Sequence, residues 1–246
     1  MKINNLLSAF FWLLYAMACI VLAMTLAFYF FGYFDYGYGI WYSLLGIDEH
    51  LATYASQNTL KPQFHLLNAT EHQALFSHVA TSVHSNGKGL EELTYLTDTG
   101  LQIRLFHQAE IQHLQDVALL FKQAKLGALC VLLIWPLLAY LVLKEGRTSW
   151  WQRSLSLSLV FTPLLLWLGI AGPTQVFYQF HEWVFPAENA WFFYWEESHM
   201  SAMMKAPYLF GVIAIEIALC ALLLTPLVHG LGLKFALRLR TLIQRP

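Results

Sequence analysis

Residues 3–34 have the sequence INNLLSAFFWLLYAMACIVLAMTLAFYFFGYF, which contains no Lys, Arg, Asp or Glu over 32 consecutive positions. About 20 apolar residues at ~1.5 Å each are enough to cross the ~30 Å hydrocarbon core of a bilayer. The alternative is a cleaved signal peptide, because residues 16–19 faintly resemble a lipoprotein cleavage box. A signal peptide has only ~7–15 residues in its apolar region, whereas this run continues through Phe31. We therefore expect a retained membrane-spanning helix.

The rest of the chain has the same character. Of its 246 residues, 58% are hydrophobic and 12% are charged, against roughly 25% charged in a soluble globular domain. Three more apolar runs follow, at residues 126–143, 154–172 and 206–233, and Glu216 is the only formal charge in the last run. The sequence thus excludes a water-soluble single domain. It predicts an α-helical integral membrane protein with four transmembrane helices.

The basic residues predict the orientation of these helices. Eight of the 14 lie in the N-terminus, the loop between spans two and three, and the C-terminal tail: Lys2, Lys144, Arg147, Arg153, Lys234, Arg238, Arg240 and Arg245. The positive-inside rule places these three regions in the cytoplasm. The resulting plan is a first span at 1–34, an extracytoplasmic cap at 35–125, a second span at 126–143, a cytoplasmic loop at 144–153, a third span at 154–172, an aromatic-rich outer segment at 173–205, a fourth span at 206–233 and a basic tail at 234–246.

The first outer segment is too long for a plain loop and should contain its own elements. Asn68 and Glu71 open a stretch with apolar residues at helical spacing, and Asn86-Gly87 closes it like a helix C-cap. Residues 94–97 and 101–105 flank Asp98-Thr99-Gly100 like the strands of a hairpin. We therefore expect a small α+β extracytoplasmic cap. Six scattered outer histidines are expected at its surface or in an occasional metal contact: His50, His65, His72, His78, His84 and His199.

One candidate site lies on a predicted helix that continues into the second span. Glu110, His113 and Asp116 are three residues apart, and this spacing puts them on one helix face. A carboxylate near an imidazole can fix its tautomer and raise its basicity, as a general base requires. A solvated helix face next to the membrane has the same spacing. The spacing alone leaves both interpretations open.

A second candidate site surrounds His181. It is followed by Glu182, Trp183 and Phe185, and residues 191–195 add the run WFFYW. Aromatic side chains at this density are typical of the headgroup level of a membrane, which is the depth of a lipid ester. In such a belt a single histidine also serves as an interfacial anchor.

Other chemistries have less support. The sequence contains no H-E-x-x-H zinc motif, no G-x-S-x-G elbow, no Walker loop and no G-x-G-x-x-G. We therefore predict no metal site, no cofactor and no nucleotide. The near-neutral total charge of -1 suggests no nucleic-acid partner. Glu216 is a possible intramembrane polar site, since a carboxylate facing lipid is costly. Structural satisfaction and functional use are equally compatible with it.

Two segments together resemble the lipoprotein intramolecular transacylase (Lit) family of bacterial integral membrane proteins. The first is Glu110-Ile-Gln-His113-Leu-Gln-Asp116-Val117, before span two, and the second is Phe180-His181-Glu182-Trp183-Val-Phe185, with Trp191, after span three. The resemblance implies transfer of the sn-2 acyl chain of a diacylglyceryl-modified N-terminal cysteine to the α-amino group of the same residue. It implies diacylated bacterial lipoproteins as substrates, membrane lipids as partners and the bacterial cytoplasmic membrane as location.

The same resemblance implies that His113 and His181 are the catalytic residues. Asp116, Glu110 and Glu182 then have supporting roles. We expect His113, oriented by Asp116 or Glu110, to take the amine proton, and His181 to polarise the carbonyl or protonate the leaving oxygen, although the roles can be reversed. The alternatives are a membrane lipid or lipoprotein hydrolase that uses the same histidines with water, and a non-enzymatic His-rich membrane sensor or assembly protein. Hydrolysis would release a fatty acid, and a sensor would give no lipid product.

Overall fold

The computed structural model describes residues 3–146 and 148–243 and divides into two compact units. The first comprises the described residues up to Tyr29, Lys125–Gly172, and those from Glu216 onward. The second comprises Phe30–Ala124 and Pro173–Ile215. Three of the basic residues that predict the orientation, Lys2, Arg147 and Arg245, lie outside the described residues.

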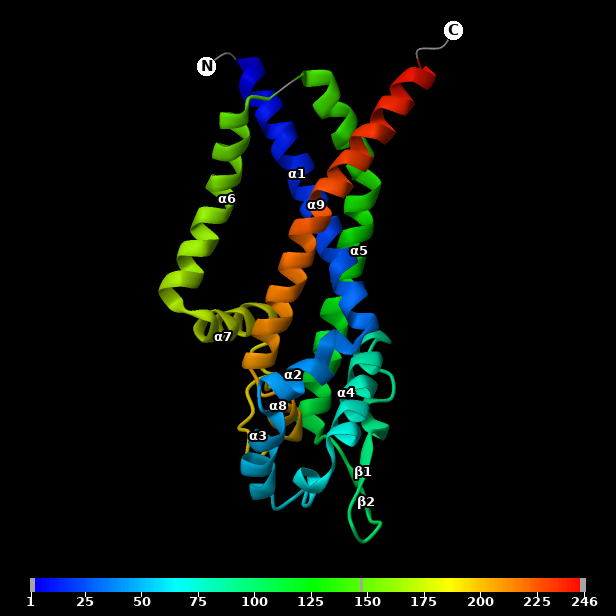
Figure 1. The fold of residues 1–246 in the computed structure, drawn as a ribbon, viewed down its shortest axis with the longest axis vertical. Coiled ribbons are helices and arrows are strands. Elements are labelled where there is room, and N and C mark those ends of the chain that lie inside the picture. Colours follow the sequence, from blue (N-terminus) through cyan, green and yellow to red (C-terminus); the bar gives the residue numbers. More distant parts are fainter. Residues whose placement is uncertain (1–2, 147, 244–246) are drawn as a thin grey trace. The chain divides into compact units, whose positions relative to one another are not determined.

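Four helices are long and apolar enough to cross a membrane, as the sequence predicts. They are α1 (Ile3–Tyr33), α5 (Gln108–Glu145), α6 (Trp150–Ala171) and α9 (Tyr208–Ile243) (Figure 1). Helices α5 and α9 continue past the predicted apolar runs at 126–143 and 206–233, because polar residues extend them at their ends. The side of the membrane that each end faces stays a prediction.

Small side chains hold α1, α5 and α9 together in the first unit. The cluster between them includes Cys19 and Ala23 of α1, Ala139 of α5 and Ala221 of α9. A methyl group added to Gly232 of α9 would lie 2.7 Å from the Trp135 ring, so only glycine fits at this approach. Close backbone approach through small residues is how helices associate in lipid, where the hydrophobic effect gives no driving force between them.

The second unit contains the remaining elements. Its helices are α2 (Tyr38–Leu44), α3 (Ile47–Tyr54), α4 (Ala69–His84), α7 (Pro173–Val184) and α8 (His199–Met203), with short 3-10 turns at Asp35–Gly37, Ala55–Gln57, Phe64–Leu66 and Leu90–Glu92. Its strands are β1 (Thr94–Leu96) and β2 (Gln102–Arg104). Parts of α1, α5 and α9 complete the unit.

Both local elements expected in the outer segment are confirmed. Helix α4 begins with a capping box, in which the Asn68 side chain accepts from the backbone N–H of Glu71 and the Glu71 carboxylate accepts from the N–H of Asn68. These bonds satisfy donors that a helix start otherwise leaves free. Strands β1 and β2 pair antiparallel with Tyr95 opposite Ile103, and Gly100 occupies the turn at φ +77°.

The core of the second unit overturns one expectation about the histidines. His72 and His199 are 2% and 0% exposed, and His50 is 6% exposed, so none of the three lies at the surface. The imidazole of His72 bonds to the Tyr42 hydroxyl through Nδ1 and to the Phe64 carbonyl through Nε2. These rings are buried because aromatic side chains from separate segments close over them, which spacing along the chain does not show.

Candidate active site

Helices α5 and α7 bring the two motif histidines together within the second unit. The ring centroids of His113 and His181 are 5.9 Å apart, and the ring planes are inclined at 33°. Their exposed fractions are 7% and 9%. The amphipathic helix α7 turns the buried side chain of His181 inward while its neighbours Glu182 and Trp183 stay exposed. Two imidazoles thus share one nearly buried location.

Aromatic rings surround this pair. Phe185 packs against both histidines, at 4.8 Å from His113 and 5.1 Å from His181 between centroids. Phe177 lies 4.1 Å from His181 and Trp191 lies 5.2 Å from it. Phe193 completes the wall at 6.2 Å from His113. The surroundings are therefore apolar, which suits an acyl chain and strengthens any hydrogen bond made inside.

The local hydrogen bond of His181 fixes its tautomer. Nδ1 lies 2.7 Å from the carbonyl oxygen of Phe177, one turn earlier in α7. A carbonyl oxygen only accepts, so Nδ1 carries the proton and the lone pair of the neutral ring is on Nε2. Burial lowers the pKa of His181, and the bond to the Phe177 carbonyl partly opposes this shift. His181 is therefore a neutral imidazole with a basic Nε2.

His113 lacks such a partner. Its Nδ1 is buried and has no hydrogen-bond partner among the described residues. The Asp116 carboxylate lies one turn further along α5, where it accepts from Asn189 Nδ2 at 2.7 Å and from Gln112 Nε2 at 3.3 Å. Among the described residues, the Asp116 carboxylate thus bonds to Asn189 and Gln112, and no hydrogen bond joins it to His113. Nδ1 of His113 is thus a buried nitrogen whose hydrogen-bonding capacity is unused by the described residues.

Glu110 has a different set of partners. Its fully buried carboxylate accepts from the Ser198 hydroxyl at 2.5 Å, from the N–H of Met200 at 3.3 Å and from the N–H of His107 at 2.7 Å. The ammonium of Lys61 lies 3.6 Å away. Burial lowers the pKa of Lys61, and the charge of Glu110 opposes this shift. Glu110 therefore ties the start of α5 to two distant segments.

The other two predicted residues lie elsewhere. Glu182 follows His181 but is exposed. Glu216 is half-buried in α9 and belongs to the first unit, whereas both histidines belong to the second. No group of three or more His, Cys, Asp or Glu side chains in 3–146 and 148–243 is arranged to hold a metal ion. Of the predicted site residues, His113 and His181 are the two whose rings lie next to each other.

Sequence reasoning missed Lys61, Ser198 and Asn189. Ser198 had a weak local signal, since it caps α8 by accepting from the N–H of Ser201. Nothing in the spacing connects Lys61 or Asn189 to the His113 helix, because they lie far away in the sequence.

Comparison with known proteins identifies the family of the chain. A family model described as "Lipoprotein intramolecular transacylase Lit" matches residues 7–208. A solved structure of the membrane integral lipoprotein intramolecular transacylase Lit from Bacillus cereus, a histidine-to-arginine mutant, has a TM-score of 0.57 and 16% sequence identity, and the match covers 98% of this chain and 93% of that chain. At that identity the likeness shows a shared fold. No curated protein matches the chain.

The Glu110 cluster generates a stability prediction. In Glu110→Ala, Lys61 loses its buried counter-charge and Ser198 and Met200 lose their acceptor. Removing one member of a buried ion pair costs ~3–5 kcal/mol, so we expect a clear drop in the melting temperature measured in detergent. Glu110→Gln keeps an acceptor and should lose less. Glu182→Ala, at an exposed carboxylate, is the matched control, and equal melting of Glu110→Ala and wild type would contradict the role of the cluster.

Proposed function

Because the chain belongs to the lipoprotein intramolecular transacylase (Lit) family, we propose that it moves the sn-2 acyl chain of a diacylglyceryl-modified N-terminal cysteine to the α-amino group of that residue. The product is a lyso-form lipoprotein. The observation that carries this proposal is the pair of neutral imidazoles 5.9 Å apart inside an aromatic wall. The substrates are diacylated bacterial lipoproteins, and membrane lipids surround the protein and its substrate.

The proposed location is the bacterial cytoplasmic membrane, with the His113–His181 site on its extracytoplasmic face and both termini in the cytoplasm. Two observations support it. Four helices are apolar enough to span a membrane. The basic residues gather at the N-terminus, residues 144–153 and the C-terminal tail, which the positive-inside rule assigns to the cytoplasm.

The hydrogen bonds favour His181 as the base and reverse the roles first expected. Its Nε2 lone pair takes a proton from the α-amine as the nitrogen attacks the sn-2 carbonyl carbon. The resulting imidazolium keeps its Nδ1–H on the Phe177 carbonyl. It then gives the Nε2 proton to the glycerol oxygen as the C–O bond breaks. One proton leaves nitrogen and one arrives at oxygen, so the step balances without another reactant.

His113 complements this base. With its proton on the unpartnered Nδ1, it donates a hydrogen bond to the carbonyl oxygen while negative charge develops there. Such a donor is most effective in a site from which water is excluded, and the rings of Phe185 and Phe193 contact His113. Asp116 and Asn189 hold the neighbouring turn of α5. Asp116 is therefore a positioning residue.

The energetics also fit a cofactor-free reaction. An ester becomes an amide, which is the more stable acyl derivative, so no nucleotide is required. Both reacting groups belong to one molecule, and holding them in contact replaces a bimolecular encounter. The protein then has to orient the two groups, move one proton and stabilise one oxyanion.

The test uses a synthetic diacyl lipopeptide with the purified protein and mass spectrometry of the products. Wild type should give an N-acyl cysteine at unchanged total mass. Loss of a general base lowers rates by ~10²- to 10⁴-fold, and we expect His181→Ala to fall on that scale. Loss of one oxyanion donor lowers rates by ~10²- to 10³-fold, which is the effect we expect for His113→Ala.

The matched control is His78→Ala, at an exposed position of α4, which should convert substrate at the wild-type rate. Release of free fatty acid would identify a hydrolase instead. Wild-type turnover by folded His113→Ala and His181→Ala would refute the mechanism.

The lowered pKa of His181 predicts the pH dependence. The ordinary pKa of histidine is 6.5, and burial lowers the pKa of His181 below this value. His181 is therefore mostly unprotonated at pH 6.5 and above, and it stops acting as a base only when the pH falls below its own pKa. The α-amine, with a pKa of ~7.7–8.0, must also lose a proton. The log of the rate against pH should therefore have a slope close to 1 between about 6.5 and about 7, flatten as the pH rises through the pKa of the amine, and steepen towards 2 below the pKa of His181.

In His181→Gln the slope should stay at 1 over the whole acidic range, since only the amine titrates. A wild-type slope of about 1.5 at pH 6.5 would show that the pKa of His181 is not lowered, because an imidazole with its ordinary pKa of 6.5 is half protonated there.

A further inference from the structure

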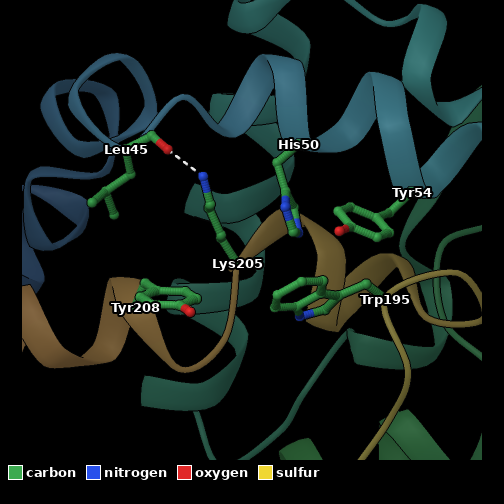
Figure 2. A pocket seen from close by; sticks show the side chains of 6 residues that line it. All are labelled: Leu45, His50, Tyr54, Trp195, Lys205 and Tyr208. Carbon is green, nitrogen blue, oxygen red and sulfur yellow. Dashed lines mark hydrogen bonds between the residues drawn. The ribbon is translucent and has the colours of Figure 1, made fainter. Parts of the chain in front are cut away.

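A cavity lies in the second unit, apart from the His113–His181 pair. Its volume is about 450 Å³, within the ~300–1,000 Å³ range of small-molecule sites. Figure 2 shows the six residues that line it: Leu45, His50, Tyr54, Trp195, Lys205 and Tyr208. All six belong to the second unit. Apolar and aromatic walls with a few convergent polar groups are typical of ligand pockets.

The polar groups of this cavity have unused hydrogen-bonding capacity. His50 is 6% exposed, and its Nε2 has no hydrogen-bond partner among the described residues. The Lys205 ammonium donates to the carbonyl of Leu45, the bond drawn in Figure 2. An ammonium has three N–H donors. A buried polar atom without a partner is unfavourable, and a ligand at this position would supply the missing hydrogen bond.

The aromatic wall is fixed in place. The His50 ring lies 4.6 Å from Tyr54 and 4.5 Å from Trp195 between centroids, and Tyr54 and Trp195 are 4.9 Å apart. The indole N–H of Trp195 donates to the Ala206 carbonyl at 3.0 Å. The three rings therefore hold one another, so the cavity is formed before a ligand arrives.

The charges in this cavity suit a singly charged anion. Burial, helped by the nearby charge of Lys205 and opposed by that of Glu196, lowers the pKa of His50 to about 4. The imidazole is therefore neutral at pH 7, and Lys205 is the positive group in the lining. With Glu196 close by, a dianion such as a free phosphate is less favoured than a phosphodiester, which carries one negative charge.

The position of the cavity points to a lipid. Tyr208 is the first residue of the apolar helix α9, and Lys205 precedes it by three positions. Tyrosine and lysine at the end of a spanning helix are typical of the headgroup level. Leu44, next to Leu45, is 70% exposed, and Ile40 on the same helix is 65% exposed, so apolar surface suited to acyl chains continues from the cavity.

We propose that this cavity binds the phosphodiester headgroup of a membrane glycerophospholipid, with the phosphate oxygens accepting from Lys205 Nζ and from His50 Nε2–H. The headgroup packs against Tyr54 and Trp195, and the acyl chains pass over Leu45 and the exposed side of α2. The bound lipid is not the acyl donor, because the groups that bind it are distinct from His113 and His181. The proposal does not depend on the transacylase reaction.

The test is a binding titration of the purified full chain in a neutral detergent, followed by native mass spectrometry. The probes are dioctanoyl phosphatidylglycerol, dioctanoylglycerol, which has the same chains without phosphate, and inorganic phosphate. We expect saturable binding of the phosphatidylglycerol alone. Loss of a charged or buried donor should weaken it by about tenfold or more, both in Lys205→Gln and in His50→Gln.

The matched controls are Lys88→Gln and His78→Gln, which make the same changes at exposed positions of the same unit; they should bind like wild type. Circular dichroism and the elution volume establish that each variant is folded, and His50→Gln leaves the Lys205–Leu45 bond intact. Equal binding of dioctanoylglycerol would show that phosphate is not recognised. Equal binding of inorganic phosphate would overturn the lipid assignment. Unchanged affinity in a folded Lys205→Gln or His50→Gln would overturn the site.

Discussion

A carboxylate with no exposed surface needs hydrogen-bond donors from the protein, and in the second unit the donors to Glu110 come from three separate segments. Glu110 meets this need with Lys61, with Ser198 and with two backbone N–H groups. The donors come from segments that lie before and far after α5. The hydrogen bonds to the Glu110 carboxylate therefore hold these segments against the start of that helix. His113 is one turn further along, and its approach to His181 depends on where this anchor places α5.

The sequence predicts the elements that depend on neighbouring residues and misses the contacts between residues that are distant in the sequence. Four apolar helices, the capped helix α4 and the hairpin of β1 and β2 are set by neighbouring residues, and each was predictable. The pairing of the two motif histidines was expected from a family resemblance. The partners of Glu110 were not predictable. Helical spacing identifies a shared face, but it cannot show that Ser198 and Lys61, rather than His113, contact the Glu110 carboxylate. Burial of His50, His72 and His199 has the same origin.

The run at 191–195 contributes side chains to both sites of the second unit. Its odd-numbered rings point inward: Trp191 and Phe193 contact the histidine pair, and Trp195 lines the cavity that contains His50 and Lys205. Its even-numbered rings, Phe192 and Tyr194, are 49% and 62% exposed. Such alternation is the pattern of an extended chain, in which successive side chains point to opposite sides. One short segment therefore supplies walls to both sites and an aromatic surface suited to lipid headgroups.

The bond between His181 and the carbonyl four residues earlier lies wholly within α7. The position of the ring proton is therefore a property of this one helix and does not rely on any residue contributed by α5. A movement of α7 as a whole would leave this bond intact and the tautomer of the imidazole unchanged. The distance between the rings of His113 and His181 can therefore change while the proton stays on Nδ1 of His181 and the lone pair stays on Nε2.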